Sequence, residues 1–110
     1  LALIENLQRQ DLNFFEEAEG IARLIKEWNL SQEEVSNKLG KAQSTIANKL
    51  RLLRLSPSER QTIIKERLTE RHARALLKIE SPQIREKALN IIIQKGLNVS
   101  ETDNLVESLL

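Results

Sequence analysis

Cysteine and methionine are absent from this chain of 110 residues, and histidine occurs once, as His72. Without cysteine there is no disulfide, no thiolate nucleophile and no cysteine-based zinc or iron–sulfur site. No aliphatic run is longer than four residues, which is far too short to span a bilayer, and no signal-peptide pattern is present. Because the chain begins at Leu1 and has no methionine, we expect it to be an excised piece of a longer protein.

The charged residues are unevenly distributed, although the formal net charge is only +1. Residues 41–78 contain ten lysines and arginines against three glutamates, a net charge of +7. Residues 1–40 and 79–110 are both mildly acidic. A basic stretch between acidic flanks is typical of a surface that meets a polyanion. The alternative is a set of helices that simply expose arginine and lysine to solvent.

Apolar residues recur three and four positions apart, and no stretch of strand length alternates with a period of two. This periodicity predicts an all-α fold, a compact multi-helix domain with short loops. The expected helices cover residues 2–9, 14–29, 31–40, 43–54 and 70–79, and three more begin at Pro57, Pro82 and Ser100. The expected N-caps are Asn13, Ser31, Ser56, Thr69, Ser81 and Ser100.

Residues 31–54 are the most informative stretch, because a helix, a short turn at Gly40 and a second helix follow one another. This is the spacing of a helix-turn-helix, in which the second helix enters the major groove of DNA. Glycine at the turn can adopt a positive φ angle without strain. With the apolar side turned inward, five polar residues of the second helix are expected to face outward: Gln43, Ser44, Asn48, Lys49 and Arg51. Glycine-turned helix pairs also occur in purely structural bundles, which is the alternative.

Amide and cationic side chains can read base edges in the major groove or hold phosphates. We assign base readout to Gln43, Ser44, Asn48, Lys49 and Arg71. We assign backbone contacts to Lys41, Thr45, Arg51, Arg54, His72 and Arg74. A solvated or helix-capping role is the alternative for His72. We expect all three aromatic residues, Phe14, Phe15 and Trp28, to pack within the second helix, which leaves no stacking platform for single-stranded nucleic acid.

Three blocks in this order carry a resemblance to a known family: residues 5–9 followed by Leu12 and residues 16–18, residues 39–41 with residues 46–53, and residues 72–77. They resemble the ParB family over essentially the whole chain. The resemblance implies a piece of a CTP-binding domain or linking helix in residues 1–12, and a helix-turn-helix DNA-binding domain in residues 13–110. It also implies binding to short palindromic sites in double-stranded DNA, with two copies of the chain per site.

Four positions resemble the nucleoid occlusion branch of the family more than its chromosome partition branch: Gln43, Lys49, Arg54 and Arg71. The resemblance implies a factor that blocks cell division over the nucleoid of a bacterium. The alternative is a partition protein that binds centromere-like parS sites. For the full-length protein, the resemblance implies a cytoplasmic, nucleoid-associated homodimer, held at the membrane through an N-terminal segment that is absent from this chain.

Residues Glu5, Asn6 and Arg9 resemble the edge of the CTP site of the family, where Asn helps to hold magnesium and Arg meets the triphosphate. The phosphate loops that complete such a pocket are missing, so we expect neither cofactor binding nor enzymatic activity from this chain. For the full-length protein, the resemblance implies a CTP- and magnesium-dependent switch with CTPase activity. Taken alone, Glu5 and Arg9 would be a surface ion pair. A CTP hydrolase piece and a helical protein-interaction module are the remaining alternatives.

Overall fold

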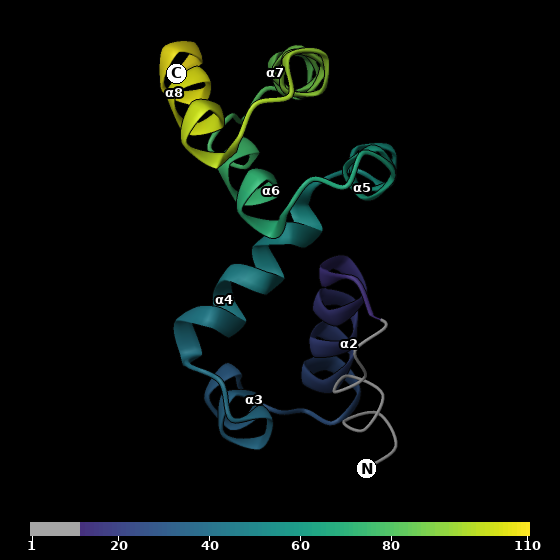
Figure 1. The fold of residues 1–110 in the computed structure, drawn as a ribbon. Helices are drawn as coiled ribbons and strands as arrows, with labels where there is room; N and C mark the ends of the chain where they lie inside the picture. The colour runs from purple at the N-terminus through teal and green to yellow at the C-terminus, as the bar shows by residue number, and fades with distance from the viewer. Residues whose placement is uncertain (1–11) are drawn as a thin grey trace. The chain divides into compact units, whose positions relative to one another are not determined.

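The computed structural model describes residues 12–110, in which helices are joined by short turns (Figure 1). The elements are α2 (Phe14–Glu27), α3 (Gln32–Leu39), α4 (Gln43–Arg51), the 3-10 turn η1 (Leu52–Arg54), α5 (Pro57–Lys65), α6 (Glu70–Leu76), α7 (Pro82–Lys95) and α8 (Val99–Leu109). This part of the chain contains no strand, which confirms the expected all-α class. The expected helix over residues 2–9 and the three residues of the CTP motif, Glu5, Asn6 and Arg9, lie outside the described residues.

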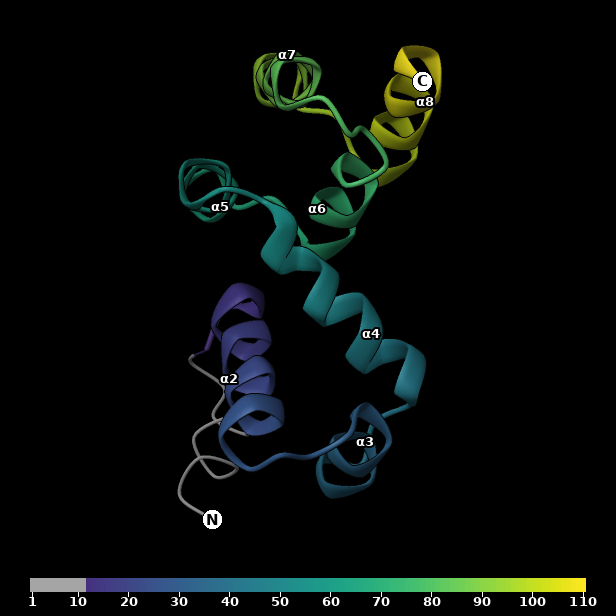
Figure 2. The same ribbon diagram turned by 180° about the vertical axis from the view of Figure 1, so that it is seen from behind.

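The helices group into two compact units along the chain, and the boundary falls between Leu53 and Arg54. In the first unit, α2 and α3 both pack against α4 (Figure 2). In the second unit, α6 packs against both α7 and α8. No helix in residues 12–110 has the length and apolarity that a membrane crossing requires.

The core of the first unit joins all three of its helices. It consists of the buried Ile21, Leu24, Val35 and Ile46, with Ile25, Leu30, Leu39 and Leu50 packed around them. These residues recur at helical spacing in the sequence, so burial of one apolar side on each helix explains the arrangement. Ile63, Leu76, Ile92 and Val106 are fully buried within the second unit.

Side-chain caps fix where the helices begin. Five of the six expected N-caps are confirmed: Asn13, Ser31, Ser56, Thr69 and Ser81. The sixth, Ser100, was wrong, because Ser100 lies inside α8 and Asn98 caps that helix instead. The Glu101 amide donates to Oδ1 of Asn98 at 2.8 Å, and Oε1 of Glu101 accepts from the Asn98 amide at 2.9 Å. This reciprocal capping box satisfies two donors that a serine two residues later could not reach.

Three helices end two or three residues earlier than expected, and one aromatic residue lies outside the core. α2 ends at Glu27, α4 passes into the 3-10 turn after Arg51, and α6 ends at Leu76. Trp28 therefore follows α2 as its C-cap residue, and 47% of its surface is exposed. Phe15 is buried instead, so the prediction that all three aromatic residues pack inward was wrong for Trp28.

Candidate nucleic-acid interface

α3, a tight turn and α4 form a helix-turn-helix in the first unit. Ser31 and Glu34 form a capping box at the start of α3, and the backbone and side-chain hydrogen bonds from Ser31 lower the pKa of the Glu34 carboxyl. Gly40 caps the end of α3, and its φ of 67° lies in the left-handed region that favours glycine. The Lys41 amide donates to the Ser36 carbonyl at 3.0 Å, which closes the turn and directs the chain into α4.

The outward side of α4 carries polar residues, as the sequence predicts. Gln43 and Ser44 are exposed in its first turn, and Arg51 is exposed in its last. Thr45 and Asn48 are half-buried, so they present only part of their side chains. Lys41 in the turn and Arg54 after the helix are exposed as well.

The beginning of α4 differs from the other helices in residues 12–110, because its N-cap is Ala42 and no side chain caps it. The first amides of a helix have no partner within the helix, and a missing cap leaves them to water or to a ligand. Aligned peptide dipoles also make a helix N-terminus favourable for anions. Gln43 and Ser44 therefore stand at the place on the helix-turn-helix that suits a phosphate or a base edge.

Lys49 does not face outward, and that expectation was wrong. Its residue surface is only 7% exposed, and its Nζ lies 3.4 Å from Oε2 of Glu17 on α2. The reason is helical geometry: Lys49 follows the core residue Ile46 by three positions, which places it on the buried side of α4. The charge of Lys49 suits an exposed side of a helix, but its position along α4 decides where it lies.

A second group of cations lies on α6, in the second unit. Arg71 and Lys78 are exposed, Arg74 is half-buried, and all three line a hollow of about 210 Å³. Asp103 of α8 lines the same hollow. The buried Nε of Arg74 has no hydrogen-bond partner in the structure. A buried N–H without a partner is costly, which distinguishes Arg74 from the exposed cations of the same helix.

His72 has a structural place on the same helix. It is 7% exposed, and its Nδ1 accepts from the Thr69 amide at 3.1 Å. Its Nε2 lies 3.0 Å from the Leu97 carbonyl. Because Nδ1 accepts, the hydrogen is assigned to Nε2, which donates to that carbonyl. Of the roles considered for His72, helix capping is the one that the structure contains: Nδ1 takes part in the cap of α6, while Nε2 is engaged with the Leu97 carbonyl.

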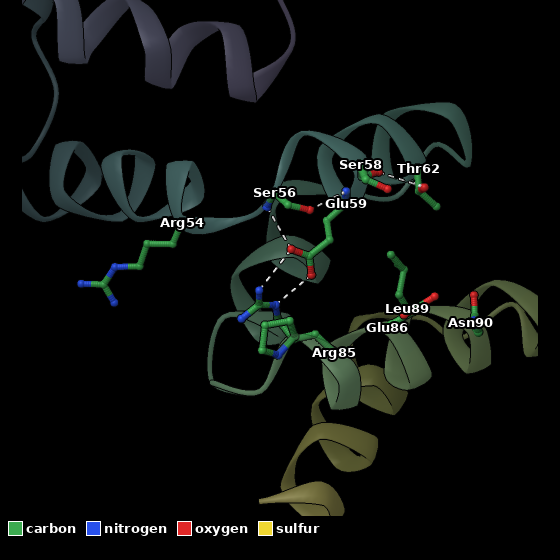
Figure 3. A pocket seen from close by; sticks show the side chains of 10 residues that line it. Arg54, Ser56, Ser58, Glu59, Thr62, Arg85, Glu86, Leu89 and Asn90 are labelled. Atoms are coloured by element: carbon green, nitrogen blue, oxygen red, sulfur yellow. Dashed lines mark hydrogen bonds and ion pairs between the residues drawn. The ribbon is translucent and has the colours of Figure 1, made fainter.

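A cleft of about 360 Å³ lies in the second unit, between α5 and α7 (Figure 3). At its side, Glu59 and Arg85 point toward one another and form a bidentate ion pair, with Nε–Oε2 and Nη2–Oε1 distances of 2.8 Å and 3.1 Å. Arg54 also lines the cleft, but its side chain points away from this pair. The pair is not evident from the sequence, because its members are 26 positions apart and belong to different helices.

The same pair ties together the ends of three helices. Arg85 Nη1 donates to the Ile79 carbonyl at 3.0 Å, just after α6, and Glu59 accepts from the Ser56 amide at 2.9 Å, at the start of α5. Burial acts to raise the pKa of Glu59, but the hydrogen bonds from Arg85 and Ser56 outweigh it and hold the pKa below its usual value. Residues 12–110 contain no cluster of three side chains that could hold a metal ion.

Comparisons with known proteins agree with this geometry. The family model described as the ParB HTH domain matches residues 10–110. The nucleoid occlusion proteins of Bacillus licheniformis and Bacillus subtilis are each 48% identical to the chain over all 110 residues. The chain spans 39% of the length of these two relatives.

Two solved structures are also similar. One is the C-terminally truncated chromosome-partitioning protein ParB from Caulobacter crescentus, complexed to the centromeric parS site. It has a TM-score of 0.85 and 35% identity, over 96% of this chain and 55% of that chain. The other is a DNA-binding domain of the chromosome-partitioning protein ParB complexed to parS, with a TM-score of 0.84 and 35% identity, over 96% of this chain and 85% of that chain.

Proposed function

Since the chain belongs to the ParB helix-turn-helix family, we propose that it is the sequence-specific DNA-binding part of a nucleoid occlusion protein. The observation that carries this proposal is the uncapped start of α4, where Gln43 and Ser44 stand exposed in a helix-turn-helix. Relatives named as nucleoid occlusion proteins, matching over the whole chain, support the choice of branch. Related structures bound to parS support double-stranded DNA as the partner.

The roles of the side chains follow from their exposure. Gln43, Ser44 and the half-buried Asn48 read base edges from α4, and Arg71 does so from α6. Backbone phosphates are held by Lys41, Thr45, Arg51, Arg54 and Arg74. Each copy reads one half of a palindromic site, so two copies occupy one site.

Fluorescence anisotropy on three duplexes tests the proposal across a salt series. One duplex carries a nucleoid-occlusion palindrome, one carries parS, and one is scrambled. We expect tight binding to the first alone. Preference for parS would move the function to chromosome partition while retaining the interface. Equal, weak binding to all three would contradict sequence-specific recognition.

Gln43→Ala separates base readout from general attraction to DNA. We expect it to cost about 1–3 kcal/mol on the cognate duplex and to leave binding to the scrambled duplex unchanged. Gln94→Ala removes the same side chain from an exposed position on α7 and is the matched control. Arg51→Ala is expected to weaken all three duplexes alike and to reduce the salt slope by about 1. An equal effect of Gln43→Ala on all duplexes would overturn the base-reading role.

For the whole protein, of which this chain is a part, we propose a homodimer that keeps cell division away from the nucleoid. Its association with the nucleoid follows from the DNA interface, and its peripheral contact with the membrane requires a segment outside this chain. CTP with magnesium would act as a switch in the whole protein. Isothermal titration of this chain with CTP and magnesium is expected to show no binding. Micromolar binding would contradict the proposal that CTP binding needs parts of the whole protein outside this chain.

A further inference from the structure

The turn that joins α5 to α6 (Figure 1) contains an arginine in a backbone conformation that usually belongs to glycine. Within residues 12–110, Asn29 and Arg67 are the two residues other than glycine with a positive φ angle, at 51° and 58°. Asparagine adopts the left-handed region comparatively easily, because its short polar side chain can bond to the local backbone. Arginine has no such side chain, and its β-carbon is unfavourable at this φ. Of the two, Arg67 is therefore the residue whose type does not suit its conformation.

Glycine would serve the backbone around Arg67 at least as well. The Arg67 amide donates to the Ile64 carbonyl at 3.1 Å, and the Leu68 amide donates to the Ile63 carbonyl at 3.0 Å. These two bonds form the Schellman motif that ends many helices, and glycine is the usual residue at its left-handed position. α3 and α7 each have a glycine in that conformation at their ends. The turn explains the conformation but not the arginine, which points to a role for the side chain.

The folded chain leaves the side chain of Arg67 available to a ligand. Arg67 is exposed, and its side chain forms no hydrogen bond or ion pair within residues 12–110. Among the acidic residues next to it in sequence, Glu66 is exposed and Glu70 is half-buried. A helix C-terminus favours a nearby cation, but Lys65 already supplies one in the last turn of α5. The guanidinium of Arg67 thus has five donors that the described part of the chain does not use.

Arg67 is four positions before Arg71, to which the proposed function assigns base readout. Four residues span at most about 14 Å, which is the length of about four phosphates along one strand of duplex DNA. Both arginines belong to the second unit and to the basic stretch, residues 41–78. A chain that presents Arg71 to a base edge therefore brings Arg67 to the phosphates of the same half-site. A guanidinium suits phosphate, because it can donate two parallel hydrogen bonds to its oxygens.

We propose that Arg67 binds a phosphate of the DNA backbone, and that the left-handed turn between α5 and α6 carries an arginine for this contact. This inference rests on the proposed DNA-binding function and adds to it a contact outside the helix-turn-helix. A phosphate contact carries no direct information about base identity. Arg67 therefore raises the affinity for every duplex and the dependence of binding on salt, and leaves the preference among duplexes unchanged.

Arg67→Gly in the full 110-residue chain separates this contact from folding. Glycine suits the left-handed conformation, so the melting temperature is expected to stay the same or to rise. The affinities for the cognate and scrambled duplexes are expected to fall alike, by about three- to tenfold, and the salt slope is expected to fall by about 1. A loss of folding cannot produce weaker binding together with an undiminished melting temperature. Wild-type affinity and salt slope in Arg67→Gly would overturn the proposal.

Two controls are matched to this variant. Asn29→Gly makes the same change of backbone preference at the other left-handed residue and should leave DNA binding unchanged. Lys95→Gln removes a positive charge from an exposed position in the last turn of α7, outside the basic stretch, and should leave the salt slope unchanged. If Lys95→Gln reduced affinity and salt slope as much as Arg67→Gly does, net charge rather than a contact would be responsible, and the proposal would be wrong.

Methylphosphonate linkages, which replace one charged phosphate by a neutral group, locate the contact on the cognate duplex. We expect one position at which neutralisation weakens binding of the wild-type chain but not of Arg67→Gly. It should lie within about four phosphates of the base pair whose substitution no longer affects Arg71→Ala. If every neutralised phosphate weakened the wild-type chain and Arg67→Gly equally, Arg67 would have no phosphate of its own.

The outcomes separate the inference from the function on which it rests. A wild-type chain that does not distinguish the cognate from the scrambled duplex would contradict the proposed function. A wild-type chain that distinguishes them, with affinity and salt slope unaffected by Arg67→Gly, would contradict only the role of Arg67.

Discussion

At the scale of single residues, His72 connects two segments of the second unit that are distant in sequence. Its ring accepts from the Thr69 amide at the start of α6 and bonds to the Leu97 carbonyl before α8. The ring is buried, so its loss would leave a donor and an acceptor with reduced access to water. Such unpaired groups typically cost about 1–3 kcal/mol each.

We therefore expect His72→Ala to lower the free energy of unfolding by about 2 kcal/mol or more, as measured by urea denaturation. Arg71→Ala is the control, since Arg71 is the exposed neighbour and surface substitutions usually change stability by less than about 0.5 kcal/mol. The opposite pattern is expected for DNA binding, where Arg71→Ala weakens recognition. Equal stability of the two variants would mean that the bonds of His72 contribute little to folding.

Periodicity and charge predict correctly whether some side chains are buried or exposed, and they fail for others for a physical reason. Ile46 and Gln43 were placed correctly, because an apolar residue and an exposed polar residue fit the simple amphipathic pattern. Lys49 and Trp28 break that pattern in opposite directions, with a buried cation and an exposed aromatic ring. Neither placement follows from the residue type alone. The burial of Lys49 depends on a carboxylate of α2, and the exposure of Trp28 depends on where α2 ends.

At the scale of helices and turns, Gly40 defines the turn of the helix-turn-helix. Its φ is 67°, and a methyl group added there would meet no atom within 4 Å. Any cost of substitution therefore arises from the backbone conformation alone, not from a clash. Gly96 at the end of α7 has the same properties, with a φ of 62° and open surroundings.

Gly40→Ala and Gly96→Ala are expected to destabilise the chain by similar amounts, about 1–2 kcal/mol each, in urea denaturation. Gly40→Asn should cost less, because asparagine tolerates the left-handed region better than alanine. A much larger cost at Gly40 than at Gly96 would show that the turn has contacts beyond its own backbone conformation.

The ion pair of Glu59 and Arg85 makes stability depend on pH. The folded state holds the pKa of Glu59 below its usual value, so the carboxylate is favoured in the folded protein. Its contribution is fully present above the unfolded pKa of about 4.3 and is lost as the pH falls through the lower, folded pKa. We expect the melting temperature to decrease from pH 6 to pH 3, and Glu59→Gln to flatten this decrease.

Glu107→Gln is the matched control for the ion pair. Glu107 pairs with Lys78 at 3.8 Å, but both side chains are more than half exposed, and such pairs contribute little. The pH profile of Glu107→Gln should therefore follow that of the wild-type chain. If the melting temperature of Glu59→Gln depended on pH as that of the wild-type chain does, Glu59 would not be a source of the acid sensitivity.

Helix starts were more predictable than contacts between helices. A cap such as Ser31 with Glu34 is contained in four consecutive residues, so sequence alone reveals it. The pair of Glu59 and Arg85 requires knowledge of how α5 and α7 are arranged in three dimensions. Ser100 was a plausible cap by residue type, but Asn98 two positions earlier forms the complete capping box with Glu101.

At the scale of the whole molecule, the chain consists of two compact units, and its basic stretch, residues 41–78, runs from one into the other along the sequence. Each unit supplies its own candidate contacts, Gln43 in the first and Arg71 in the second. A palindromic duplex offers every contact twice, related by a two-fold axis. Two chains on one duplex are therefore the expected assembly.

Sedimentation equilibrium with a labelled palindromic duplex should give two chains per duplex, and a duplex with a single half-site should bind one. Inserting about five base pairs at the centre of the palindrome turns one half-site by roughly half a helical turn relative to the other. We expect the two bound chains to touch. The insertion separates and rotates them, so it should lower the affinity for the second chain. Unchanged affinity would show that the two chains bind their half-sites independently, with all recognition contained in each chain's contacts to its own half-site.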